Sequence, residues 1–201
     1  TEERARASKS AGVGQTKTDA NTGAQQLFES AGYEPEWTSW FIRITMDEPP
    51  GRPQIPAGIS IRPYRQSDDH ASYQMIDAAF SEWPGRGPEP FEVWAPVVRH
   101  PNFAPDLSPL AFDGDELVGA VLSYDYPDAQ EGWIQQLATK ATHRRRGIAQ
   151  ALLLTAFGWF HVRGRRTVGV ATDSRTGAFA LYEKVGMRVV RQYTRYTKRL
   201  D

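Results

Sequence analysis

The sequence contains no cysteine, and this absence excludes several kinds of chemistry at once. Disulfide bonds, a thiolate nucleophile and cysteine-ligated metal sites all require that residue. Four histidines are present, and their positions show no paired metal-ligand spacing: His70, His100, His143 and His161. We therefore expect a chain without a metal centre.

An excess of charge of one sign is also missing, as are long apolar runs. The 24 Lys and Arg residues balance 24 Asp and Glu residues, so the formal net charge is zero and gives no general attraction to nucleic acid. No window approaches the run of about 20 apolar residues that crosses a bilayer, and the start lacks the pattern of a secretory leader. We expect a cytoplasmic protein with no membrane and no nucleic-acid partner.

A proline-rich stretch divides the chain. Residues 47–58 contain four prolines and two glycines among polar side chains. Proline restricts its own backbone and that of the residue before it, so such a stretch is typical of a linker. The sequence predicts a linker at 47–58, between a short segment, 1–46, and a longer body, 59–201.

The body alternates between strand-like and helix-like patterns. Alternating apolar residues predict strands at 58–64, on both sides of Asp113-Gly114, and at 133–139, 166–173 and 187–200. Apolar residues at helical spacing predict helices at 65–80, 144–164 and 176–186. Proline and aromatic residues between 83 and 109 predict irregular surface. This order indicates an α/β or α+β fold with a mixed sheet.

One stretch of sixteen residues occurs twice. TDSRTGAFALYEKVGM begins at Thr172 and TDANTGAQQLFESAGY begins at Thr18, and eight of the sixteen aligned positions are identical. Chance similarity of two amphipathic helices is one interpretation. Duplication of a domain is the other, and the matching strand-helix-strand context favours it. We therefore expect residues 1–46 to be the C-terminal remnant of a first domain.

The step from strand 133–139 to helix 144–164 carries the most informative chemistry. Backbone N–H groups at a helix N-terminus have no intrahelical acceptor, and together with the helix dipole they can bind an anion. Gly147 lets the backbone come close, and Arg144, Arg145 and Arg146 add positive charge. A solvated arginine run and a local nucleic-acid patch are the alternatives, but the position at a helix start favours a diphosphate site.

At this point the sequence resembles the GCN5-related N-acetyltransferase (GNAT) family. The family signature [QR]-x-x-G-x-[GA] matches RRRGIA at 144–149, and a second signature matches RTGAFALYEKVGM at 175–187. Both stand in the family's order and spacing, and the resemblance covers about residues 59–200. It implies a mixed, mostly antiparallel sheet with a splayed central strand pair. The chain also resembles tandem-domain, mycothiol synthase-like members, which fits the repeat at Thr18.

The resemblance implies a co-substrate and its contacts. Acetyl-CoA, or another acyl-CoA, is the expected acyl donor, with no metal. The backbone of Leu137, Ala138 and Thr139 is expected to meet its pantetheine arm. The diphosphate is expected on the following loop and helix, at Arg144, Arg145, Arg146, Gly147, Ile148, Ala149 and Gln150.

Tyr182 matches the family's general acid, a phenol that protonates the departing CoA thiolate. Its alternative role is that of an aromatic anchor that packs the helix on the sheet. Arg175 stands where the family often has asparagine, so we expect it to reach a phosphate instead. In the first copy Phe28 replaces the tyrosine and no phosphate loop is present, so that copy is not a second active site.

The general base is not readable from the sequence. The candidates are Glu82, Glu89, Glu131, His100 and an ordered water. A group of aromatic residues can either line an acceptor pocket or belong to the core: Trp83, Phe91, Trp94, Phe103, Tyr124 and Tyr126.

We expect an N-acetyltransferase that moves acetyl directly to a small-molecule or peptide amine in a ternary complex, since no cysteine can carry the acetyl group. A non-catalytic acyl-CoA-binding module is the alternative. In the remnant, Trp37, Trp40 and Phe41 are expected to be buried against the body or a second chain. An exposed strand edge there favours a homodimer.

Overall fold

A computed structural model describes residues 12–83 and 85–199. It divides into two compact units that do not follow the linker. The first unit takes the described residues up to Ile42, together with Ala171–Ala180 and the chain from Val189 onward. The second unit takes Arg43–Val170 and Leu181–Arg188. Each unit is described by itself below, and the domain boundaries expected from the linker stay a prediction.

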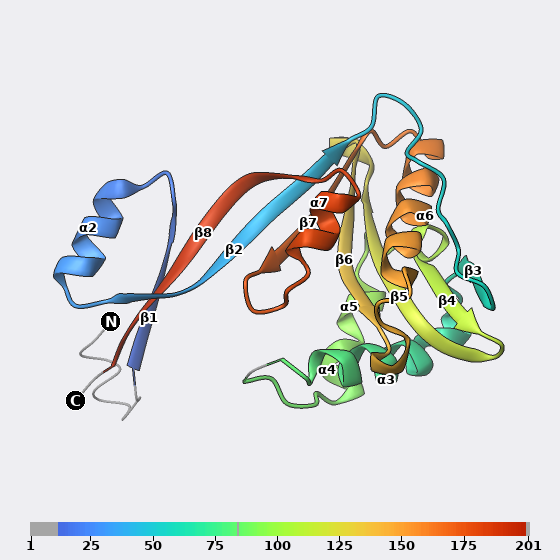
Figure 1. Ribbon diagram of the computed structural model, residues 1–201, viewed down its shortest axis with the longest axis horizontal. Helices are drawn as coiled ribbons and strands as arrows, with labels where there is room; N and C mark the ends of the chain where they lie inside the picture. The colour runs from blue at the N-terminus through green and yellow to red at the C-terminus, as the bar shows by residue number, and fades with distance from the viewer. Residues whose placement is uncertain (1–11, 84, 200–201) are drawn as a thin grey trace. The chain divides into compact units, whose positions relative to one another are not determined.

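The described residues form a mixed sheet with helices, which confirms the predicted fold class (Figure 1). The strand order is β1-β8-β2-β7-β6-β5-β4-β3. The strands are β1 Gly12–Thr18, β2 Glu34–Thr45, β3 Ile59–Pro63, β4 Pro109–Asp113, β5 Glu116–Tyr126, β6 Glu131–Thr139, β7 Thr167–Asp173 and β8 Arg188–Arg199. The α-helices are α2 Thr22–Ser30, α3 Asp69–Phe80, α4 Phe91–Trp94, α5 Pro96–Arg99, α6 Ile148–Val162 and α7 Phe179–Lys184. Single 3₁₀ turns are η1 Gln66–Asp68, η2 Pro105–Leu107, η3 Pro127–Ala129 and η4 Ala141–His143.

In the second unit the strands from β3 to β6 are antiparallel neighbours, and β6 pairs with β7 in parallel. The predicted hairpin at Asp113-Gly114 is present. Asp113 pairs with Glu116, and Gly114 has a φ of 58°, which a glycine adopts without strain. The parallel step from β6 to β7 needs a long connection, and α6 supplies it.

Helices α6 and α3 pack on opposite faces of this sheet. A Cβ atom on Gly132 would lie 2.6 Å from the Phe160 ring of α6, so glycine lets this helix approach closely. Leu122 and Ala138 join a buried cluster with Ile76 of α3 on the other face. Because successive strand residues face opposite sides, one sheet supplies both contacts.

The segment from 83 to 109 is more ordered than its composition suggests. It forms α4, α5 and η2, and Trp94, Ala95 and Leu107 within it are buried. The prediction of irregular surface is therefore wrong in part. Its aromatic residues cover the α3 face of the sheet, because a large apolar ring gains most when it leaves water.

In the first unit, β1 pairs with β8 in antiparallel register from Gly12–Arg199 to Thr18–Tyr193. Helix α2 follows β1, and its Phe28 packs against the rings of Tyr33 and Tyr196. Phe41 is 39% exposed in the single chain, and the expected burial of the β2 aromatics against the body or a second chain stays a prediction.

The two copies of the repeated sequence fold into helices of different length. Asn21 caps α2, because its side-chain oxygen accepts a hydrogen bond of 3.0 Å from the Ala24 N–H. At the equivalent place Arg175 cannot accept such a bond. Thr176 instead bonds to the Ala178 N–H, and α7 begins only at Phe179. The helix predicted at 176–186 is therefore shorter than expected.

Candidate functional site

The central parallel strand pair separates partway along its length. Residues 131–134 of β6 pair with residues 167–170 of β7, and the pairing stops at Ile134 and Val170. Strand β6 continues to Thr139, and this part has no β7 partner among the described residues. Backbone groups of Leu137, Ala138 and Thr139 lie here, on a strand edge that is open to an extended ligand.

A β-bulge marks the same place. Leu122 of β5 pairs with Gln136, whereas the next residue, Ser123, pairs with Ile134. Gln135 is therefore an extra residue in β6. A bulge disrupts the ladder locally and redirects the side chains around it, and bulges are frequent beside active sites.

The loop after β6 presents a run of free backbone donors. The N–H groups from Arg145 to Gln150 donate to no atom of the described chain, and the first bond of α6 runs from the Ala151 N–H to the Gly147 oxygen. Arg145 and Gly147 have positive φ angles of 60° and 87°, which turn the loop sharply before the helix. Such a run of N–H groups at the N-terminus of a long helix is suited to a diphosphate.

The side chain of Arg144 is already engaged. Its guanidinium donates to both carboxylate oxygens of Glu82, at 2.6 and 3.1 Å, and its Nε donates to the Thr139 carbonyl oxygen at 3.1 Å. Hydrogen bonds from Arg144 lower the pKa of the Glu82 carboxyl. Arg144 thus joins the end of β6, the loop and Glu82, which lies two residues beyond α3.

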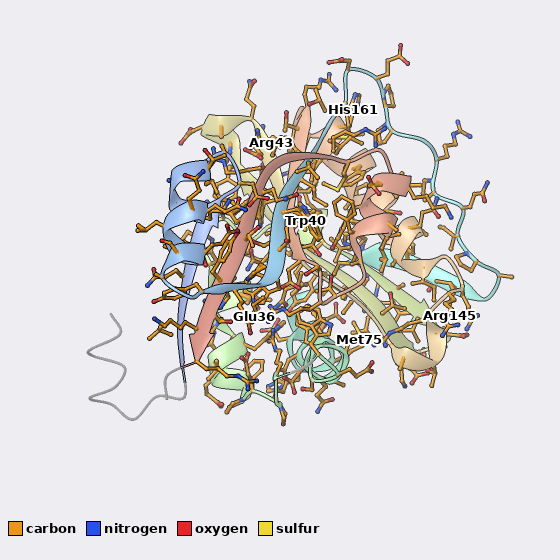
Figure 2. All side chains as sticks on the ribbon, turned by 60° about the vertical axis from the view of Figure 1, so that its left-hand side comes forward. Glu36, Trp40, Arg43, Met75, Arg145 and His161 are labelled. Atoms are coloured by element: carbon orange, nitrogen blue, oxygen red, sulfur yellow. The ribbon has the colours of Figure 1, made fainter. Side chains whose placement is uncertain are left out.

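The next two arginines differ from Arg144. Arg146 lies 3.5 Å from Asp113, which also has the Nε2 atom of His143 at 3.3 Å. Arg145 has no ion-pair partner among the described residues, and Figure 2 labels it at this loop. The positive charge available for an anion therefore comes chiefly from Arg145, because Arg146 is partly neutralised by the Asp113 carboxylate.

Tyr182 lies on α7 and is only 5% exposed. Burial raises the pKa of its phenol, so the group stays protonated through the physiological range. Its hydroxyl has no hydrogen-bond partner within the described chain. A protonated phenol without an internal partner is able to donate a proton to a ligand atom.

Arg175 belongs to the first unit, where two local partners hold it. Asp173 accepts two hydrogen bonds from its guanidinium, at 2.7 and 3.2 Å, and the centroid of the Trp37 ring lies 4.3 Å from its Cζ atom. The hydrogen bond with Asp173 raises the pKa of Arg175. Its expected contact with a cofactor phosphate stays a prediction, and that contact would compete with Asp173.

Each side chain named as a candidate base already has a partner. Glu82 binds Arg144, Glu89 binds Arg86 at 3.0 Å, and Glu131 binds Arg43 at 2.8 Å. The Nδ1 atom of His100 accepts a hydrogen bond from the Asn102 N–H. These pairs favour an ordered water over the three carboxylates as the base.

Of the aromatic residues named as possible pocket lining, Trp94 and Tyr124 are buried. Trp83, Phe91 and Phe103 pack partly buried against the α3 cluster, and Tyr126 lies beside Tyr124. The core interpretation therefore accounts for most of this group.

Within the described ranges, no group of acidic and histidine side chains could hold a metal ion. Nor is any helix there long and apolar enough to cross a membrane.

The unpaired end of β6, the donor loop and the start of α6 form one continuous stretch, and the expected contacts of this stretch with an acyl-CoA stay a prediction. The bulge at Gln135 was missed, because a single extra residue leaves no clear trace in an alternating pattern. The Glu82 partner of Arg144 was missed as well, since no local signal joins residues so far apart.

Comparisons with known proteins agree with this geometry. The model of the Acetyltransferase (GNAT) family matches residues 70–187. A crystal structure of a GCN5-related N-acetyltransferase from Sphaerobacter thermophilus has a TM-score of 0.84 and 35% identity, covering 98% of this chain and 65% of its own. A mycothiol acetyltransferase from Geodermatophilus obscurus is 27% identical over 175 residues, 82% of this chain and 56% of its own.

A tandem GNAT protein from the clavulanic acid biosynthesis pathway shares the fold at 15% identity, with a TM-score of 0.68, covering 98% of this chain and 66% of its own. This chain spans less than two thirds of each of these three relatives. The family match covers more than half of the described chain and includes the donor loop and Tyr182. The chain belongs to the GNAT family of acetyltransferases.

Proposed function

We propose that this chain is an acyl-CoA-dependent N-acetyltransferase that moves acetyl from acetyl-CoA directly to an amine. The observation that carries the proposal is the run of unbonded N–H groups from Arg145 to Gln150, next to the part of β6 without a β7 partner. An acyl-CoA combines a diphosphate with an extended amide-bearing arm, and these two features match its two parts.

The chain's own groups divide the binding work. The N–H groups of the donor loop and the charge of Arg145 hold the diphosphate. The open backbone of Leu137, Ala138 and Thr139 pairs with the pantetheine amides. Arg144 acts through Glu82 and Thr139 as a positioning residue that fixes the loop.

In the reaction, the amine nitrogen attacks the thioester carbonyl carbon, the C–N bond forms and the C–S bond breaks. Tyr182 gives its proton to the departing sulfur, and its buried phenol is suited to this because it stays protonated. The amine proton passes to water. Unpaired backbone N–H groups of β6 polarise the carbonyl oxygen as negative charge develops on it.

Binding and turnover are measured separately to test this function. Acetyl-CoA at about 100 times its Kd should add roughly 2.7 kcal/mol to the free energy of unfolding, which raises Tm by roughly 5–10 °C for a chain of this size. ATP should give a much smaller shift, because it lacks the pantetheine arm. Thiol release with an amine panel then measures transfer. Binding without release for any amine would identify a non-catalytic acyl-CoA-binding module, and no shift would refute the cofactor site.

The repeat supports a proposal about organisation. Residues 1–46 are the remnant of a first GNAT-like domain, 47–58 a linker and 59–201 the complete domain. Strand β1 ends the strand order of the described chain, so one of its edges has no neighbour there. A homodimer through this edge follows from the tendency of open edges to pair. Light scattering over a range of concentrations tests it, and a monomer throughout would contradict it.

A further inference from the structure

Two consecutive glutamines stand at the β6 bulge, and each accepts a hydrogen bond from a tryptophan. The Nε1–H of Trp94 donates to the Gln136 side-chain oxygen at 2.9 Å. The Nε1–H of Trp133 donates to the Gln135 side-chain oxygen at 3.2 Å. Trp94 is 4% exposed in α4, so it provides a fixed anchor.

Both glutamines lie on the face of the sheet opposite α6. Trp133 pairs with Tyr124, whose hydroxyl donates to the Val97 oxygen of α5. Gln136 reaches Trp94 in α4, the helix that directly precedes α5. The same covering segment therefore meets the partners of both amides.

The tryptophans determine how the two amides are oriented. An indole N–H can only donate, so the oxygen of each amide must face its tryptophan. The NH₂ group of each amide then faces away from the ring. Neither NH₂ group has an acceptor in the described part of the chain, and Gln136 is not among the side chains with a buried unpaired atom. The bulge thus presents two oriented pairs of N–H donors to solvent.

These donors select for one kind of atom. An oxygen of a hydroxyl or carbonyl group accepts from them, whereas an ammonium group has only donors and gains nothing. They stand where β6 leaves β7, at the inner end of the stretch assigned above to the pantetheine arm. A molecule that approaches this end of the open edge meets the two amides.

We infer that Gln135 and Gln136 are specificity residues that donate hydrogen bonds to oxygen atoms of the acceptor molecule. The acceptor is then an amine that carries a hydroxyl or carbonyl oxygen close to its nitrogen, rather than a plain alkylamine. This inference rests on the proposed N-acetyltransferase function. It deepens that function by naming the class of acceptor.

The test measures amine binding to the complex with CoA, which cannot react. Glycinamide and ethanolamine carry the oxygen, and propylamine lacks it. We expect calorimetry to show the first two binding about tenfold tighter than propylamine, since one good hydrogen bond gives up to about tenfold in affinity. Equal binding of all three amines would overturn the inference.

Substitutions assign the preference to the two residues. Gln136→Glu keeps the acceptor for Trp94 but loses the donors, and Gln136→Met removes both without adding charge. Each should reduce the preference for oxygen-bearing amines about fivefold, as should Gln135→Glu. Gln74→Glu is the matched control, because Gln74 is exposed on α3 and this substitution adds the same negative charge as Gln135→Glu or Gln136→Glu.

Acetyl-CoA affinity distinguishes a failure of the acceptor inference from a failure of the proposed function. It should stay within about twofold in all of these variants. Loss of acetyl-CoA affinity in the Gln135 and Gln136 variants would assign the amides to the pantetheine arm and overturn the inference. Absence of acetyl-CoA binding in the unmodified chain would instead refute the proposed function itself. An unchanged amine preference in both Gln135→Glu and Gln136→Met would also overturn the inference.

Discussion

Glu82 and Arg144, 62 residues apart in sequence, are joined by two hydrogen bonds of 2.6 and 3.1 Å. Both carboxylate oxygens of Glu82 accept a hydrogen bond from Arg144. The pair connects the loop that carries the free N–H groups to Glu82, two residues beyond the end of α3. Its main effect is therefore on the order of the loop, and this leads to the first prediction.

Replacing Glu82 with Gln should weaken acetyl-CoA binding by about twofold to fivefold. Both side chains are more than a third exposed, so the loss of stability should stay below about 1 kcal/mol. Calorimetry measures the affinity, and a urea titration measures the stability. Glu92→Gln is the matched control, because Glu92 is exposed on α4 and has no ion-pair partner among the described residues. An affinity equal to that of the control would contradict a positioning role for the pair.

Removing the hydroxyl of Tyr182 should slow turnover and spare binding. Tyr182→Phe is expected to lower kcat by about 100-fold or more, since a positioned general acid contributes roughly 10²–10⁴-fold. Its hydroxyl has no partner within the described chain, so Tm should hardly change. Steady-state kinetics and calorimetry with acetyl-CoA check both expectations. A variant as fast as the parent chain would leave Tyr182 as a packing anchor only.

The same phenol sets the alkaline side of the pH profile. Because burial raises the pKa of Tyr182 above its usual value near 10, the proton stays on the group as pH rises to that value. We expect no loss of kcat from this residue below about pH 10. Stability should also fall at alkaline pH. Above about pH 10 the unfolded chain loses this proton while the folded chain keeps it, so the free energy of unfolding decreases as pH rises. A plot of kcat against pH with a Tyr182-dependent fall near pH 8 would contradict the assignment.

Replacing Gly147 should lower both the stability of the chain and its affinity for acetyl-CoA. Gly147→Ala places a Cβ on a residue with a φ of 87°, which should cost roughly 1 kcal/mol or more in stability. It should also weaken acetyl-CoA binding, because the donor loop turns at this residue. Gly164→Ala is the control for strain alone, since Gly164 has a φ of 85° at the other end of α6. Gly158→Ala, inside α6 with free space around it, should instead stabilise by about 0.5–1 kcal/mol. Equal acetyl-CoA affinity in the Gly147 and Gly164 variants would exclude the loop as the diphosphate site.

Asp68 should make stability depend on pH in the acid range. Arg62 donates two hydrogen bonds of 2.8 Å to its carboxylate, and these bonds lower the pKa of Asp68. A lowered pKa contributes stability above the unfolded value near 4, and this contribution is lost as pH falls through the folded value. Asp68→Asn should cost about 1–3 kcal/mol at pH 7, as expected for hydrogen bonds to charged groups. It should also flatten the dependence on pH below about 5. Asp106→Asn, from the exposed pair with Arg163, should leave that dependence nearly intact. If the free energy of unfolding depended on pH in the same way for Asp68→Asn and for the parent chain, the role of this pair would be refuted.

The sequence predicted those parts of the fold that depend on local pattern. The alternation around Asp113-Gly114 predicted a hairpin, and the change from a strand-like to a helix-like pattern after Thr139 predicted the step from β6 to α6. The family signatures then located the donor loop and Tyr182. In each case the physical cause lies within a few residues of the feature, so a linear reading is enough.

The parts that escaped depend on partners far away in the chain. The bulge at Gln135 depends on the register between β5 and β6. The orientation of Gln136 depends on a tryptophan 42 residues away. None of these contacts leaves a periodic signal in the sequence.

The pairing of Gly12 with Arg199 has a consequence for how the first unit forms during synthesis. Strand β1 is translated well before its neighbour β8. Until β8 has been synthesised, β1 lacks this partner, and the nascent chain must keep it from pairing elsewhere. Contacts between residues so distant in sequence also slow folding, because a long loop must close before they form. A stop codon placed just before β8 would therefore leave β1 without the strand with which it pairs.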